Sequence, residues 1–259
     1  MATAPSPHIG LFVTCLADLF RPEIGFAAVQ LLEQCGCTVS VPLQSCCGQP
    51  AYNSGDQKKA SELAKAVIRT LEPFDGIVVP SGSCAAMIRH HYPPLLETEG
   101  DWHARARAVG EKTFELSQFL VEEMGLETVP GRHLEPGNRK VTYHDSCSGL
   151  RELGIREQPR KLLRHCSGIQ LEEMHNSEIC CGFGGTFCVK YPEISTRMAD
   201  NKISGIEDTG AEMVLGGDLG CLMQIAGRLK RGGKSPRVYH YAELLVEEPS
   251  HHGLAEDNG

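Results

Sequence analysis

The sequence predicts an α/β protein of two tandem, pseudo-equivalent cysteine-rich domains, each a small and mainly parallel sheet flanked by helices. Three observations support this prediction. Short apolar runs typical of strands alternate with segments that have helical periodicity, which is the pattern of a parallel α/β sheet. Cysteines recur in the same order in both halves of the chain. A segment rich in glycine and proline, residues 125–138, lies between the halves.

Each half carries one cysteine, then an adjacent pair followed by glycine, then one more cysteine. The two gaps are 31 and 37 positions in the first half and 33 and 40 in the second. Such similar gaps indicate two copies of one folding unit. We therefore predict domains at residues 1–132 and 133–259. The predicted metal ligands are Cys15, Cys46, Cys47 and Cys84 in the first domain and Cys147, Cys180, Cys181 and Cys221 in the second.

In the first half, the expected elements are three strands with helices between them. The strands are expected over 8–15, 38–43 and 76–80, and the helices over 24–32 and 56–71. Asp56 is the expected N-cap of the second helix. Each cysteine of the set follows a strand. Because the carboxyl ends of parallel strands share one edge of the sheet, the four thiols are expected to meet there.

The second half repeats this order. Its strands are expected over 140–144, 169–174 and 213–215, and its helices over 159–165, 192–206 and from Asp218 onward. Each copy is expected to close with a similar helix, over 114–123 (FELSQFLVEE) and 239–248 (YHYAELLVEE). Gly48 and Gly182, which follow the cysteine pairs, can adopt positive φ and let the backbone approach a bulky group closely.

Composition and the first residues exclude several function classes. Acidic residues outnumber basic ones, 33 to 25, and no basic cluster alternates with aromatic residues, so no nucleic-acid ligand is expected. Residues 1–7 contain no Lys or Arg, and Asp18 interrupts the apolar stretch 8–20, so neither a signal peptide nor a transmembrane segment is expected. The chain is therefore predicted to be cytoplasmic.

The cysteine usage favours metal binding. In a reducing compartment, twelve cysteines are unlikely to form disulfides. Adjacent cysteines are also too close to bridge each other, because consecutive Cα atoms lie about 3.8 Å apart and a disulfide usually spans about 4.4 to 6.8 Å. Neighbouring thiolates can instead reach different irons of one cluster, or one thiolate can bridge two. Zinc held by four thiolates stays an alternative at one site.

The motifs resemble those of the lactate utilization protein A family. The resemblance rests on FVTC at 12–15, CCGQPAYNSG at 46–55, PSGSC at 80–84, HDSC at 144–147, CCGFGGTF at 180–187 and GCLMQIAGRL at 220–229. The paired Cys-Cys-Gly motifs are also similar to those of the cysteine-rich component of heterodisulfide reductase and of the iron-sulfur component of glycolate oxidase.

The resemblance implies an oxidoreductase subunit that holds iron-sulfur clusters, of the four-iron type, and transfers electrons in a complex that oxidises L-lactate to pyruvate. It implies two partners, a ferredoxin-type iron-sulfur protein and a third lactate-utilization subunit, and a small 2-hydroxy acid as substrate. Two alternatives stay open: a cluster-based thiol or disulfide oxidoreductase, and a protein whose zinc is only structural.

The sequence departs from the heterodisulfide reductase pattern at one position in each copy. The cysteine-rich component of that enzyme ends each motif in Cys-x-x-Cys, whereas this chain has Ser81 and Asp218 at the first of those positions. Asp218 can supply an oxygen ligand to a metal, while Ser81 is expected to cap the following helix.

Several neighbouring residues are open to more than one interpretation. Cys35, Cys37 and Cys166 are expected to pack in the interior, and Cys188 is expected to support the site rather than ligate. His144 and Asp145 can either move protons and hydrogen-bond a ligand sulfur, or fix the loop before Cys147.

Overall fold

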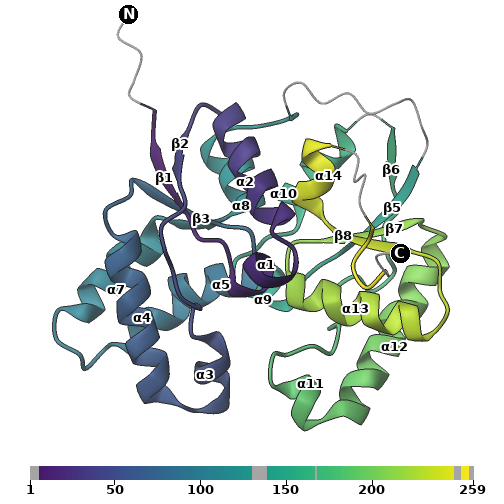
Figure 1. The fold of residues 1–259 in the computed structure, drawn as a ribbon. Helices are drawn as coiled ribbons and strands as arrows, with labels where there is room; N and C mark the ends of the chain where they lie inside the picture. The colour runs from purple at the N-terminus through teal and green to yellow at the C-terminus, as the bar shows by residue number, and fades with distance from the viewer. Residues whose placement is uncertain (1–5, 130–138, 167, 248–251, 257–259) are drawn as a thin grey trace, which may run out of the picture. The chain divides into compact units, whose positions relative to one another are not determined.

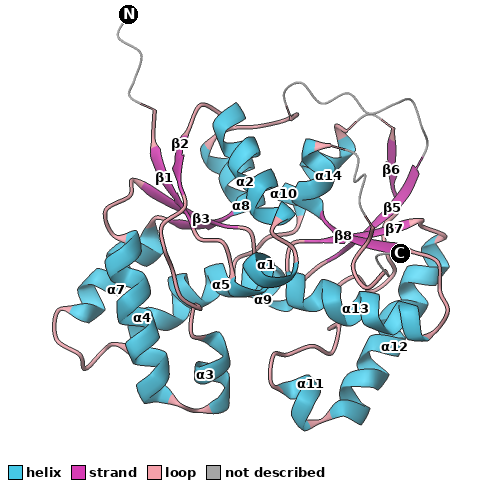
Figure 2. Cartoon of the chain, in the orientation of Figure 1, coloured by secondary structure: helices cyan, strands magenta, loops and turns pink. Residues whose placement is uncertain are grey.

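The computed structural model describes residues 6–129, 139–166, 168–247 and 252–256. The chain forms two compact units, Met1–Leu126 (unit 1) and Glu127–Gly259 (unit 2). Each unit contains a four-stranded sheet in which every strand pair is parallel, flanked by helices (Figures 1 and 2). This architecture confirms the predicted fold class. The predicted domain boundary at residue 132 lies outside the described residues and stays a prediction.

In unit 1 the strand order is β2-β1-β3-β4. The strands are β1 (His8–Leu11), β2 (Thr38–Ser40), β3 (Gly76–Val79) and β4 (Thr113–Glu115). The α-helices are α1 (Cys15–Phe20), α2 (Glu23–Gln34), α3 (Gln49–Ser54), α4 (Gln57–Leu71), α5 (Gly82–Ala86), α6 (Tyr92–Leu95), α7 (Trp102–Glu111) and α8 (Leu116–Gln118). Two π-helical turns complete the unit, η1 (Met87–His91) and η2 (Phe119–Glu123).

Unit 2 repeats the strand order as β6-β5-β7-β8. Its strands are β5 (Arg139–His144), β6 (Ile169–Leu171), β7 (Met213–Gly216) and β8 (Arg237–His240). Its helices are α9 (Cys147–Arg151), α10 (Glu157–Arg164), α11 (Phe187–Lys190), α12 (Pro192–Thr209), α13 (Leu219–Arg231) and α14 (Tyr241–Val246). Among the helices of the described residues, none is both long enough and apolar enough to cross a membrane.

The central strands of each sheet are buried on both faces, as expected where helices cover a parallel sheet. All residues of β3 and of β7 are buried. The helix before each of these strands buries residues at matching intervals. These positions are 60, 64, 67, 68 and 71 in α4 and 195, 199, 202, 203 and 206 in α12. Val67 therefore corresponds to Lys202, so one copy buries a lysine where the other buries a valine.

Local signals set most element boundaries where the sequence predicts them. Asp56 caps α4 by accepting a hydrogen bond from the Lys59 backbone amide at 3.0 Å, as expected. Three expected strands, over 8–15, 38–43 and 169–174, are shorter than predicted by three residues or more, and the last of them ends at Leu171. The first ends at Leu11, because Cys15 already begins α1, and the second ends at Ser40, before the segment that contains Pro42.

The expected closing helices were partly wrong. Residues 113–115 and 237–240 form β4 and β8, and helical structure starts only after them. Each strand pairs in parallel with the preceding buried strand, β3 or β7, and thereby extends the sheet. Glu115 and His240, the last strand residues, then cap the following helices. Tertiary pairing therefore overrides the local helical pattern over these segments.

The glycine after each cysteine pair has the positive φ that the sequence predicts, 84° at Gly48 and 85° at Gly182. The space around the two residues differs. A Cβ at Gly182 would lie 2.4 Å from the Ser195 carbonyl oxygen, whereas a Cβ at Gly48 would lie 3.3 Å from the Leu63 Cβ. The contact at Gly182 is with a backbone atom of a helix, which cannot move aside as a side chain can.

We expect Gly182→Ala to destabilise the protein more than Gly48→Ala. Both changes place Cβ in a left-handed conformation, which costs about 1–2 kcal/mol, and only the first adds a collision with the backbone of α12. Urea unfolding of the metal-free variants, followed by circular dichroism, measures the difference. Equal losses of stability would contradict this steric explanation.

Candidate metal centres

The structure gathers the four predicted ligands of unit 1 beyond the carboxyl ends of its strands. Cys15 begins α1 after β1, the pair Cys46 and Cys47 follows β2, and Cys84 lies in α5 after β3. The Sγ atoms of Cys47 and Cys84 are 3.3 Å apart. Cys46 accepts hydrogen bonds from the thiols of Cys15 and Cys47. The four thiols therefore form one continuous chain of contacts.

Unit 2 gathers its four predicted ligands in the same way. Cys147 begins α9 after β5, the pair Cys180 and Cys181 follows β6, and Cys221 lies in the first turn of α13 after β7. Cys180 accepts hydrogen bonds from Cys147 and Cys181, and Cys181 is hydrogen-bonded to Cys221. In both units the backbone amide of the glycine after the pair points to the first sulfur, at 3.5 Å for Gly48 and 3.4 Å for Gly182.

The thiol contacts set the protonation of each group. Hydrogen bonds from neighbouring thiols lower the pKa of Cys46 and of Cys180 to about 2. The hydrogen bond to that thiolate in turn raises the pKa of its neighbours, which are Cys15, Cys47, Cys147 and Cys181. The first cysteine of each pair is therefore the thiol that most readily loses its proton, and its neighbours hold theirs more firmly. A metal cation would displace those protons and bind the sulfurs.

This donor set fits a thiophilic metal or an iron-sulfur cluster. Thiolates are the ligands that iron-sulfur clusters and zinc prefer. The second cysteine of each pair, Cys47 or Cys181, is buried, whereas Cys15 is exposed. The twelve cysteines are free thiols, so no disulfide competes for the eight sulfurs. Each set can therefore hold a metal with one side shielded by protein.

His144 is a further residue of the unit 2 site. It ends β5, is 1% exposed, and neither ring nitrogen has a hydrogen-bond partner among the described residues. A ligand atom of His144 and the sulfurs of Cys181 and Cys221 all lie within 4.8 Å of one another. Burial, together with the charge of Lys202, lowers the pKa of His144 to about 3, so the imidazole is neutral at neutral pH. These contacts favour an interaction with the metal site.

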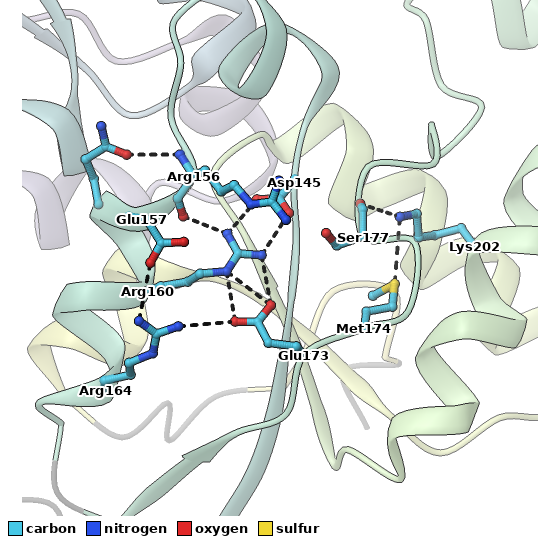
Figure 3. Close-up of polar contacts among 10 residues, drawn as sticks. Asp145, Arg156, Glu157, Arg160, Arg164, Glu173, Met174, Ser177 and Lys202 are labelled. Carbon is cyan, nitrogen blue, oxygen red and sulfur yellow. Dashed lines mark hydrogen bonds and ion pairs between the residues drawn. The ribbon is translucent and has the colours of Figure 1, made fainter.

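Asp145, the next residue, has a structural role instead. Its two carboxylate oxygens each accept a hydrogen bond of 2.8 Å from the guanidinium of Arg160 on α10 (Figure 3). The same guanidinium also donates to Glu173 and to the Arg156 carbonyl. Burial raises the pKa of Asp145, but the hydrogen bonds and charge of Arg160 outweigh burial and lower it. The ion pair fixes the turn that carries His144 and Cys147.

Lys202 brings a buried cation to the same site. Its Nζ donates to the Ser177 carbonyl at 2.8 Å and lies 3.7 Å from the Met174 sulfur (Figure 3). Burial lowers the pKa of this ammonium, while the negative charges of Cys181, Asp145 and other nearby groups oppose that shift. The sequence contains a signal for this placement, because residue 202 lies on the same helix face as Ala199 and Ile206.

The remaining predicted residues have local structural roles. Ser81 caps α5, as expected, by accepting a hydrogen bond from the Cys84 amide at 3.4 Å. Asp218 is buried at the N-cap of α13, and its role as an oxygen ligand stays a prediction. The Cys188 thiol donates to the Gly185 carbonyl at 3.1 Å, and Cys166 is buried against Leu162.

Comparisons with known proteins identify the family. The cysteine-rich domain family model matches residues 9–89 and 141–226. Lactate utilization protein A of Anoxybacillus flavithermus is 50% identical over 239 residues, which cover 92% of this chain and 98% of that protein. The protein of the same name from Geobacillus kaustophilus is 48% identical, with the same coverage of both chains. The chain belongs to the lactate utilization protein A family. This membership confirms the resemblance that the six sequence blocks predict.

Another member, lactate utilization protein A 2 of Bacillus cereus (strain Q1), is 44% identical over 240 residues and is covered over 98% of its length. Among solved structures, a hypothetical protein from Helicobacter pylori superposes with a TM-score of 0.63 and 11% identity. That match covers 98% of this chain, which spans 50% of the length of the Helicobacter protein. It supports the fold of this lactate utilization protein A family member.

We expect Arg160→Met to destabilise unit 2 by about 3–5 kcal/mol, because it leaves the Asp145 carboxylate buried without its charged partner. Arg164→Met is the matched control on the same helix. Its ion pairs with Glu157 and Glu173 are partly exposed, and such pairs contribute about 0–1 kcal/mol. Urea unfolding followed by circular dichroism compares the two variants. Similar stabilities for both would show that the buried pair is not needed.

Proposed function

We propose that this chain is the iron-sulfur electron-transfer subunit of a cytoplasmic complex that oxidises L-lactate to pyruvate, with one metal centre in each unit. The observation that carries the proposal is the gathering of four thiols beyond the strand ends of each sheet. The names of the relatives support the lactate part of it, because the chain covers nearly their whole length at 43–50% identity. A reducing compartment agrees with twelve free cysteines.

The residues of each unit would hold a cluster in defined ways. The four thiols supply the metal ligands, and the cluster, when bound, supplies one-electron redox chemistry. The Gly48 and Gly182 amides donate to the first sulfur of each pair, which stabilises negative charge on that sulfur. Asp218 is a candidate oxygen ligand in unit 2 only, because Ser81 at the corresponding position caps a helix.

A cavity beside the unit 1 thiols argues against lactate binding there. It measures about 600 Å³, and Cys15, Cys46 and mostly apolar side chains line it. Among the described residues that line the cavity, Asp18 is acidic and none is Lys, Arg or His. A 2-hydroxy acid carries a carboxylate, for which Arg is the preferred side-chain partner, and the described lining of this cavity offers no basic side chain. We therefore assign lactate oxidation to a partner protein and electron transfer to this chain, with a ferredoxin-type protein and a third subunit as the other members.

A second candidate function is a structural zinc site in unit 2. The close approach of His144, Cys181 and Cys221 favours it, because zinc binds mixed imidazole and thiolate ligands. Zinc would stabilise the fold without redox chemistry. Metal analysis distinguishes the two functions.

Anaerobically purified protein is expected to contain iron and acid-labile sulfide and to show visible charge-transfer absorption. Cys47→Ser and Cys181→Ser should each remove about half of the iron and half of the acid-labile sulfide, because each removes a buried ligand of one set. Cys35→Ser should leave the iron and sulfide content unchanged. Burial raises the pKa of Cys35 to about 11, so this half-buried thiol keeps its proton. Stoichiometric zinc without iron would contradict the iron-sulfur assignment.

Lactate is expected to bleach the visible absorption only when the partner subunits are present, because the chain alone has no assigned site for lactate oxidation. Absorption spectra of the isolated chain and of the reconstituted mixture, each with lactate, provide the comparison. An unchanged spectrum in the complete mixture would contradict the lactate assignment and leave the cluster assignment intact.

A further inference from the structure

The two units differ in two buried side chains that occupy corresponding positions in the repeated fold. His144 stands three residues before Cys147, and Phe12 stands three residues before Cys15. Lys202 and Val67 occupy the same place in the buried patterns of α12 and α4. The unit 1 residues are apolar and almost fully buried, at 0% exposure for Phe12 and 1% for Val67. Unit 2 thus places an imidazole and an ammonium where unit 1 has hydrocarbon.

Lys202 directs its charge at the unit 2 thiols. It is 1% exposed, and it interacts electrostatically with Cys147, Cys181 and Cys221. Asp145, a carboxylate that interacts with the same ammonium, is also paired with Arg160 through two hydrogen bonds (Figure 3). The ammonium donates to the neutral Ser177 carbonyl, so its charge is opposed by Asp145 and, once a metal has displaced their protons, by the ligand sulfurs. In a buried region this charge acts with little screening.

His144 supplies the second polar group. Its ring lies close to the Cys181 and Cys221 sulfurs, and neither ring nitrogen has a hydrogen-bond partner among the described residues. A buried polar group without a partner costs about 1–3 kcal/mol. An imidazole N–H donated to a thiolate sulfur removes that cost. Hydrogen bonds to sulfur are one of the means by which a protein raises the potential of a cluster.

We propose that Lys202 and His144 make the metal centre of unit 2 more readily reduced than that of unit 1. Reduction adds one electron, and therefore one negative charge, to the centre; the electron comes from the lactate-oxidising partner in the proposed complex, or from dithionite in the test. A nearby ammonium and an N–H donor stabilise the reduced form, whereas Phe12 and Val67 offer no such stabilisation. This inference rests on the proposed iron-sulfur function.

A redox titration of the full chain with dithionite, followed by EPR spectroscopy, tests the inference. Cys47→Ser and Cys181→Ser assign the signals to unit 1 and unit 2 by removing one signal each. The unit 2 signal is expected to appear at a higher potential than the unit 1 signal. Equal midpoints, or a higher midpoint for unit 1, would overturn the inference.

Two substitutions replace the polar residues of unit 2 with the residues found at the corresponding positions of unit 1. His144→Phe and Lys202→Val are each expected to lower the midpoint potential of the unit 2 centre and to leave that of unit 1 unchanged, which serves as an internal control. Lys202→Met keeps more of the side-chain volume and serves where Lys202→Val folds poorly. His165→Gln is the matched control, because His165 is exposed at the end of α10 and should alter neither midpoint.

The outcomes separate this inference from the proposed function. If both clusters are present and the unit 2 midpoint potential does not change in His144→Phe or in the Lys202 variants, the inference is wrong and the proposed function still stands. Protein that lacks iron and sulfide when purified anaerobically would overturn the proposed function and the inference with it. A purely structural role would lower stability and cluster content without moving the midpoint of the clusters that remain.

Discussion

The sites depend on the convergence of four thiols at one edge of a parallel sheet. Because every strand of each sheet runs in the same direction, the chain returns to the same edge after each strand. Cysteines more than thirty positions apart thereby come within hydrogen-bond distance, as Cys47 and Cys84 do at 3.3 Å. Four thiols in contact compete for protons, so the set cannot be fully ionised until a cation neutralises it. Metal binding at either site would therefore be coupled to deprotonation of its thiols.

Much of this arrangement could be predicted from the sequence, because it follows from local patterns. The order of strands and helices, the caps at Asp56 and Ser81, and the positive φ of Gly48 and Gly182 all depend on nearby residues. The meeting of the thiols follows from the strand order alone. Lactate utilization protein A membership was likewise visible in the six motif blocks.

The parts that could not be predicted depend on tertiary contacts. β4 and β8 lie in segments with a helical pattern, and they become strands because an edge of a buried sheet is available for pairing. The spacing places Lys202 on the apolar face of its helix, but a lysine is usually solvated, and its burial is evident only once α12 packs on the sheet. His144 and Asp145 were equally open to two roles. The structure separates them, since only Asp145 has an ion-pair partner, Arg160.

The buried polar groups of unit 2 bear on the charge of the metal centre proposed for this unit. Removing an ammonium from water costs several kcal/mol, and the contacts of Lys202 with a carbonyl and a thioether offset only part of that. Val67 shows that the same fold accepts an apolar residue at the corresponding place. A cation is therefore not needed to pack the helix against the sheet. In the proposed function, thiolates that have lost their protons to a metal would provide this compensation, and a centre that gains negative charge on reduction would provide more of it.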